Sequence, residues 1–375
     1  MKNLLVGNGI NIQFDIYNYT TKAIVLRILE ELDSPNFPKH IIIDEPILLK
    51  CHMGKLFLYA RDAIDGAFNK STICTAEKIA LVDFIERYKN KKQSLRIADI
   101  GFEDYYLIHD LVCHKYGITN PEQYIVRESM KMAYFYSIYN HGNLELLHTQ
   151  YSNSFKNFLM SFNNIFSTNY DKNIENAIEK NVFHIHGQFD KLSEVYNQDS
   201  FRNQMHDAPL EGISVDYQYK YLYSTAVSTY CGDYKQYQIN QNILANEALE
   251  KMASAYLRNQ EIRDDIDSWM NNSNQLVVNM ADSIKLKISN PSLRFQEDYP
   301  INELKEISGT LIILGLSPYN DYHLFELIDN SNIEMCIYYF YSESEIDKVK
   351  EIFPKLDSMG KLKLQRAQEF WRDLR

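Results

Sequence analysis

Three polar stretches of this chain each end an apolar run, and each holds residues that could act on a bound ligand. Gly7 and Gly9 follow "NLLV", Asn169 follows "NIFST", and His186 ends the run "NVFHIH". Glycines at a strand end let backbone N–H groups approach a phosphate, and a histidine can accept a proton near neutral pH. Neighbouring strand ends would bring these stretches to one crevice. Taken alone, the glycine pair is equally consistent with a tight turn.

The glycine turn does not match the pattern of a hydride-transfer dehydrogenase. The third glycine of G-x-G-x-x-G is replaced by Ile12. The acidic residues further along, Glu30 and Glu31, fall on an amphipathic helical pattern and not at a strand end, where they would bind a ribose. A hydride-transfer dehydrogenase is therefore disfavoured.

The elements that must position these residues are predicted by apolar periodicity. The apolar runs are short and alternate little, which is typical of parallel strands covered on both faces. Between them the spacing is helical, as at Val25, Ile28 and Leu32. The sequence predicts an α/β fold with a Rossmann-like parallel sheet and large helical insertions. Within one unit, 1–375, we assign the core to 1–18, 155–192 and 305–345, helical insertions to 19–154 and 193–304, and a helical C-terminal tail to 346–375.

Composition excludes several classes of protein. The formal net charge of -11 argues against strong free binding to nucleic acid, which depends on neutralising phosphates with cations. The N-terminus does not resemble a signal peptide and no long apolar stretch occurs, so we expect a cytoplasmic protein with no membrane segment. The cysteines never form C-x-x-C, which predicts reduced thiols and no structural zinc; they are Cys51, Cys74, Cys113, Cys231 and Cys336.

Four motifs, in order along the chain, resemble those of the sirtuins. Residues 7–11, GNGIN, resemble the sirtuin Gly-Ala-Gly-Ile-Ser turn, and residues 167–171, STNYD, resemble Thr-Gln-Asn-Ile-Asp. His186-Gly187 is similar to the catalytic His-Gly, and residues 315–317, GLS, to the Gly-Thr-Ser that contacts the dinucleotide. The resemblance covers the core strands and leaves the insertions unmatched. It implies a sirtuin-type sheet that binds NAD.

The departures from the sirtuin pattern favour NAD cleavage over deacylation. The cysteine pairs that hold zinc in protein deacylases are absent, and "IQFDIYNY" stands where those enzymes have Gly-Ile-Pro-Asp-Phe-Arg. What remains is similar to the zinc-free, sirtuin-like NAD-cleaving effectors of bacterial anti-phage defence, some of which assemble with a HerA-type ATPase. This resemblance implies a metal-free NAD glycohydrolase that forms an oligomer. A protein deacylase and a non-catalytic nucleotide-binding subunit stay open as alternatives.

The resemblance also implies a role for each motif residue. His186 is the general base, Asn169 orients the attacking water, and Asp171 hydrogen-bonds the nicotinamide amide. The expected contacts to pyrophosphate, phosphate or ribose come from Gly7, Asn8, Gly9, Asn11, Gly315, Ser317 and Asp321.

Three residues have a plain structural alternative. Asp171 precedes a helical pattern and could cap that helix, and Asp321 could lie in a surface turn of "SPYND". His184, two positions before His186, is expected to be packed within the protein and not to act on the ligand.

Overall fold

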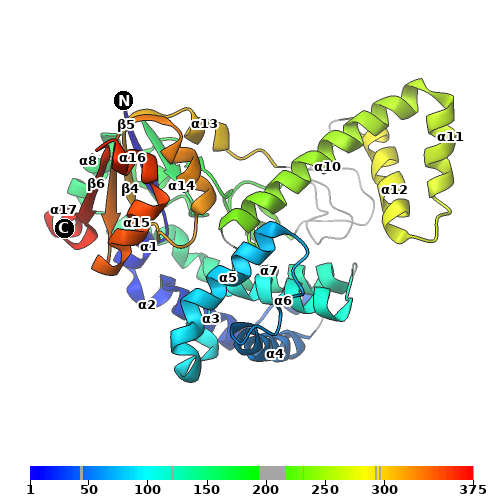
Figure 1. Cartoon of the computed structure of the whole chain (residues 1–375), viewed down its shortest axis with the longest axis horizontal. Coiled ribbons are helices and arrows are strands. Elements are labelled where there is room, and N and C mark those ends of the chain that lie inside the picture. The colour runs from blue at the N-terminus through cyan, green and yellow to red at the C-terminus, as the bar shows by residue number, and fades with distance from the viewer. Residues whose placement is uncertain are drawn as a thin grey trace.

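The computed structural model describes most of the chain as one arrangement of a sheet and helices (Figure 1). The described residues are 1–42, 45–119, 122–193, 216–230, 232–291, 294 and 297–374. Of the cysteines, Cys231 lies outside them, and the other four are free thiols.

The core is a six-stranded sheet in which every pair is parallel, and this confirms the predicted fold class. The strand order is β3-β2-β1-β4-β5-β6. The chain therefore runs outward from β1 in one direction and then returns to continue from β4 in the other, so the switch point lies between β1 and β4. The strands are β1 (Lys2–Val6), β2 (Asn164–Ser167), β3 (Phe183–His184), β4 (Ser308–Leu314), β5 (Asn332–Phe340) and β6 (Leu362–Arg366).

Both faces of the sheet are buried, which explains why its strands read as continuous apolar runs. Leu5 packs on one face, and Leu4 and Val6 pack on the other, because successive side chains of a strand alternate. The Leu5 face is covered by α13 (Ile301–Lys305), α14 (Tyr322–Asp329), α15 (Ile346–Ile352) and α16 (Pro354–Ser358). The opposite face is covered by α1 (Gly9–Phe14), α8 (Asn153–Met160), α9 (Asn173–Ile178) and α17 (Ala367–Leu374).

The first insertion is helical, as predicted, and has its own core. Its helices enclose a large apolar cluster that also takes in Phe189 and Tyr221. Tyr139 and Tyr221 stack with ring centroids 3.9 Å apart, so the two insertions meet here. The helices are α2 (Ile16–Tyr19), α3 (Thr21–Glu31), α4 (Pro46–Ile64), α5 (Thr75–Tyr88), α6 (Phe102–Tyr116) and α7 (Glu122–Tyr139).

The second insertion is dominated by the long helix α10 (Gly232–Arg258). Figure 1 shows α10 leading away from the sheet to a hairpin of α11 (Gln260–Trp269) and α12 (Gln275–Ser289). A small separate cluster, which includes Ile266 and Ile284, holds this arm together.

The C-terminal tail corrects one prediction. We expected residues 346–375 to be helical, but β6 lies within them and extends the sheet beside β5. The segment 362–366 reads LKLQR, and its strand is only partly buried because it lies at the sheet edge. Such a short polar edge strand lacks the apolar run by which the central strands were recognised. Within the described part of the chain, no helix combines the length and apolar character needed to cross a bilayer.

Candidate active site at the carboxyl ends of the strands

The predicted site residues meet in one cavity of about 690 Å³ at the carboxyl ends of the central strands. In an open parallel sheet this edge, at the switch point, is where ligands bind. Residues far apart in the sequence reach it because β1, β2 and β4 are neighbours. The cavity is lined by all ten predicted residues: Gly7, Asn8, Gly9, Asn11, Asn169, Asp171, His186, Gly315, Ser317 and Asp321.

The glycine turn is packed tightly against the loop that follows β4. The N–H groups of Gly7 and Gly9 donate to the carbonyls of Leu314 and Gly315, at 3.1 and 2.8 Å. A Cβ on Gly9 would lie 2.6 Å from the Cα of Gly315, so only glycine fits. These two N–H groups are thus used within the protein. Among the described residues, the Asn8 N–H has no hydrogen-bond acceptor, and it remains able to donate to a phosphate.

Asn11 and Asp171 hold the two loops of the site together. The carboxylate of Asp171 accepts a hydrogen bond from Asn11 Nδ2 at 2.7 Å and two more from Asn173, from its backbone N–H and its side-chain Nδ2. Asp171 does not cap α9 in the usual way, since the residue at that position is Lys172. A carboxylate has about four acceptor positions, so the protein already fills most of them.

Asn169 lines the cavity, and both its backbone N–H and its carbonyl are held by hydrogen bonds. Its N–H donates to Ser167 Oγ at 3.0 Å, and its carbonyl lies 2.9 Å from His184 Nδ1. His184 also contacts Glu175, at 2.7 Å, and is buried, which confirms that it is a packed structural residue. Among the described residues, nothing hydrogen-bonds the Asn169 amide group, so it is available to a ligand or a water molecule.

His186 follows β3 and is held by a segment of the second insertion. Its carbonyl accepts a hydrogen bond from Val227 N–H at 2.9 Å. The next residue, Gly187, has φ +76, and a Cβ there would lie 2.1 Å from the carbonyl oxygen of Thr225. The glycine after the histidine is therefore required by the close approach of residues 224–227.

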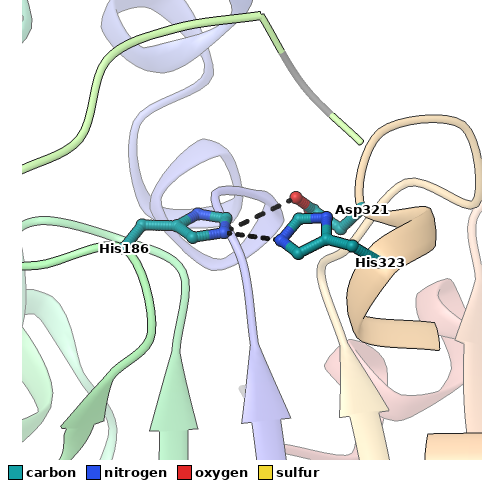
Figure 2. Close-up of side chains that lie close together, drawn as sticks. All are labelled: His186, Asp321 and His323. Atoms are coloured by element: carbon teal, nitrogen blue, oxygen red, sulfur yellow. Dashed lines mark hydrogen bonds and ion pairs between the residues drawn. The ribbon is translucent and has the colours of Figure 1, made fainter. Parts of the chain in front are cut away.

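The electrostatic surroundings of His186 come from α14 and α10. Its Nε2 lies 3.5 Å from Nε2 of His323 and 3.9 Å from Oδ1 of Asp321 (Figure 2). Burial lowers the pKa of His186 well below its usual range, and the charge of Lys235 and the His323 ring lower it further. The imidazole is thus neutral at physiological pH, with a lone pair available.

Burial acts on the two neighbours of His186 as well. It raises the pKa of Asp321 to about 6, against the opposing effect of Lys235. It also lowers the pKa of His323 to about 3, where Lys235 acts in the same direction. Lys235 itself is buried and forms an ion pair with Glu103, with Nζ 3.2 Å from Oε1.

The sequence did not point to His323, Lys235 or Glu103. His323 lies two positions after Asp321 in "NDYHLF", so an Asp-x-His pair at a helix start was the available signal. Lys235 and Glu103 lie at the starts of α10 and α6, in the two insertions, and carry no local signal. Lys235 and Glu103, together with Phe102, form part of the cavity wall.

Ser317 completes the wall beside the glycine turn. Its Oγ accepts a hydrogen bond from Tyr319 N–H at 3.3 Å, which leaves its hydroxyl proton free to donate to a ligand. The cavity therefore combines donors for a phosphate, an amide that can orient water and a neutral imidazole that can accept a proton. This chain has no match among protein-family models, curated proteins or solved structures.

Proposed function

We propose that this protein is an NAD glycohydrolase that converts NAD and water to nicotinamide, ADP-ribose and a proton. The observation that carries the proposal is the meeting of Gly9, Asn169 and His186 in one cavity at the switch point of a parallel sheet. A cavity of about 690 Å³ is within the size range of ligand sites, roughly 300–1,000 Å³. The sirtuin-like motifs give the substrate, since they are the parts that bind NAD in that family.

The chemistry needs few catalytic groups. The bond between the ribose carbon and the pyridinium nitrogen breaks, its electron pair goes to the nitrogen, and nicotinamide leaves as a neutral molecule. No general acid is required, in contrast to ordinary glycosidases, which must protonate a poor leaving group. A water molecule then bonds to the oxocarbenium-like ribosyl carbon and loses one proton.

The residues supply these functions as follows. His186 accepts the proton of the water, and the unbonded amide of Asn169 orients that water. Since the ribosyl cation is a strong electrophile, a base of low pKa is sufficient. The Asn8 N–H and the Ser317 hydroxyl donate to the phosphates, and Gly9, which has no side chain, lets the phosphates approach the turn closely.

Asp171 and Asn11 have a shared part in the proposal. Their mutual hydrogen bond sets the distance between the glycine turn and the loop after β2, and the remaining acceptor position of Asp171 receives the nicotinamide amide. Asp321 and Gly315 line the same cavity, and we assign them to the ribose.

The biological setting follows from the resemblance alone. We infer that the protein acts in the cytoplasm as an anti-phage effector that depletes NAD, as a homo-oligomer and with a HerA-type ATPase as a possible activating partner. The surfaces for such contacts would lie on the insertions, which have no counterpart in the resemblance.

The test is nicotinamide release, measured by chromatography of products from NAD, with the protein alone and with candidate ATPase partners. We expect His186→Ala and Asn169→Ala each to lower release by about 10²- to 10⁴-fold, because they remove proton transfer or water alignment. His40→Ala, which changes an exposed histidine outside the cavity, and Asn36→Ala, at another exposed position, are the matched controls. Circular dichroism checks that all four variants fold.

Other outcomes identify the alternatives. Wild-type turnover in both site variants contradicts the proposed site. Release that occurs only when an acylated peptide is added indicates a protein deacylase. Calorimetric binding of NAD without product, alone and with partner, indicates a non-catalytic nucleotide-binding subunit.

A further inference from the structure

The cluster formed by His186, Asp321 and His323 has a geometry that proton transfer does not explain. One donor atom from each of the three residues lies within 4.8 Å of the other two, and all three residues are buried. Figure 2 shows the two imidazoles and the carboxylate turned toward a common point, from the end of β3 and the start of α14.

The internal hydrogen bonds of the cluster are poor. Asp321 is at the N-cap of α14, yet its side chain accepts no hydrogen bond from the helix. His323 Nδ1 is buried without a hydrogen-bond partner, and its Nε2 has only the 3.5 Å contact to His186. Buried polar groups almost always have good partners, and a bound ion is one of the few explanations for exceptions.

The distances suit a tetrahedral metal ion. Ligand atoms bound to zinc at about 2.0–2.1 Å are about 3.4 Å apart, close to the 3.5 Å between the two Nε2 atoms. The carboxylate oxygen of Asp321 lies 3.9 Å from His186 Nε2 and within 4.8 Å of the His323 ligand atom, so it must move toward both rings, by about half an ångström toward His186, to reach tetrahedral spacing. Two imidazoles and one carboxylate are a ligand set that selects zinc and its neighbours over magnesium or calcium.

The charges nearby allow a divalent cation. The positive charge of Lys235, on α10, disfavours the binding of a cation at the cluster. Its ammonium group, however, forms an ion pair with Glu103. The carboxylates of Asp321 and Glu103 together exceed the single charge of Lys235, so the local balance is negative.

We propose that His186, Asp321 and His323 bind one Zn²⁺ ion, and that the bound ion inhibits the site. Coordination takes up the Nε2 lone pair of His186. The inhibition rests on the proposed function, because NAD cleavage uses the same histidine as its base. The binding of zinc does not depend on the proposed function. The reaction itself needs no metal, so zinc acts as a reversible inhibitor.

Metal binding is tested first, without NAD. Protein dialysed against a chelator is titrated with Co²⁺, whose visible absorption reports tetrahedral coordination, and with Zn²⁺ by calorimetry. We expect one equivalent per chain. His323→Gln and Asp321→Asn keep the side-chain volume and should each weaken zinc binding at least about tenfold, since each removes a ligand. His40→Ala should bind as the wild type does.

The outcome that overturns the site is an absence of cobalt absorption, or equal zinc affinity in wild type and His323→Gln. Inhibition is tested separately by measuring nicotinamide release at increasing free zinc. The zinc concentration that halves release should rise at least about tenfold in His323→Gln, and a chelator should restore the wild type. Equal zinc sensitivity of the two proteins contradicts the inhibitory role. If wild type binds zinc but releases no nicotinamide, the proposed function fails while the metal site stands.

Discussion

At the scale of single residues, the polar side chains of the cavity form two groups. Asn11 and Asn173 both donate hydrogen bonds to Asp171, and these bonds fix the loops. His186, Asp321 and the Asn169 amide have few or no good hydrogen bonds to the described protein. Buried or half-buried polar groups without good hydrogen bonds cost stability, and such groups concentrate at functional sites. We therefore expect the first group to determine stability and the second to determine chemistry.

Glu145, near Asp171, gives a pH prediction that is separate from the metal cluster. Burial raises its pKa from 4.5 to about 7, helped by the negative charge of Asp171. The folded state thus holds this proton more tightly than the unfolded state, so stability falls as pH rises from about 4.5 to about 7. Above that range the Glu145 carboxylate is charged in both the folded and the unfolded state, so the folded state carries the full free-energy cost of burying that charge.

Glu145→Gln should remove the cost of burying a charged carboxylate, because glutamine is neutral at every pH. Its amide oxygen can still accept the hydrogen bond that Lys172 N–H donates to Glu145 Oε2. The variant should be more stable than wild type at pH 8 by roughly 1–3 kcal/mol and similar to it near pH 4. Denaturant unfolding at both pH values measures the difference. An equal difference at the two pH values would contradict the assignment.

At the scale of elements, the site depends on loops that approach each other more closely than side chains allow. Residues 224–227 of the second insertion cross over Gly187 and bond to His186. Gly187→Ala places a Cβ against backbone atoms at a positive φ, so neither strain nor clash can be relieved by a side-chain shift. We expect a loss of roughly 2 kcal/mol or more in the free energy of unfolding, together with reduced nicotinamide release.

The matched control for this prediction is Gly117→Ala. Gly117 also has a positive φ, +68, but a Cβ there meets nothing within 4 Å. This variant carries only the backbone strain of a residue with a Cβ at positive φ, about 1–2 kcal/mol. Denaturant unfolding compares the two. Equal losses would mean that the contact between Gly187 and the second insertion is unimportant.

At the scale of the whole molecule, the parts differ in the size of their cores. The sheet is buried on both faces, whereas among the side chains that the structure describes, the arm of α10, α11 and α12 is held by a small cluster of four buried apolar residues. Local opening costs least where few apolar groups are buried. Hydrogen exchange followed by mass spectrometry should show faster exchange in α11 and α12 than in β1, β4 and β5. Equal protection of the arm and the sheet would contradict this prediction.

Local patterns were enough to predict the core of the fold. β1, β4 and β5 are buried strands, so they appear as apolar runs, and α3 shows the helical spacing of Val25 and Ile28 behind the N-cap Thr20. β6 was missed because an edge strand with polar residues has no such signal. The residue types of a short segment indicate its hydrophobic periodicity and its burial. They do not indicate whether the segment pairs as a strand at the edge of a sheet.

The sequence by itself determined which residues could do chemistry after the strands: the glycine turn, Asn169 and His186. Only the tertiary structure decided that they share a cavity, and that the Gly7 and Gly9 N–H groups donate to carbonyls at the end of β4 and in the loop after it. It also decided that His323 and Lys235 lie close to His186. The physical reason is that residue type and periodicity are local properties. Distances between loops, burial of charge and the meeting of separate insertions depend on how the whole chain packs.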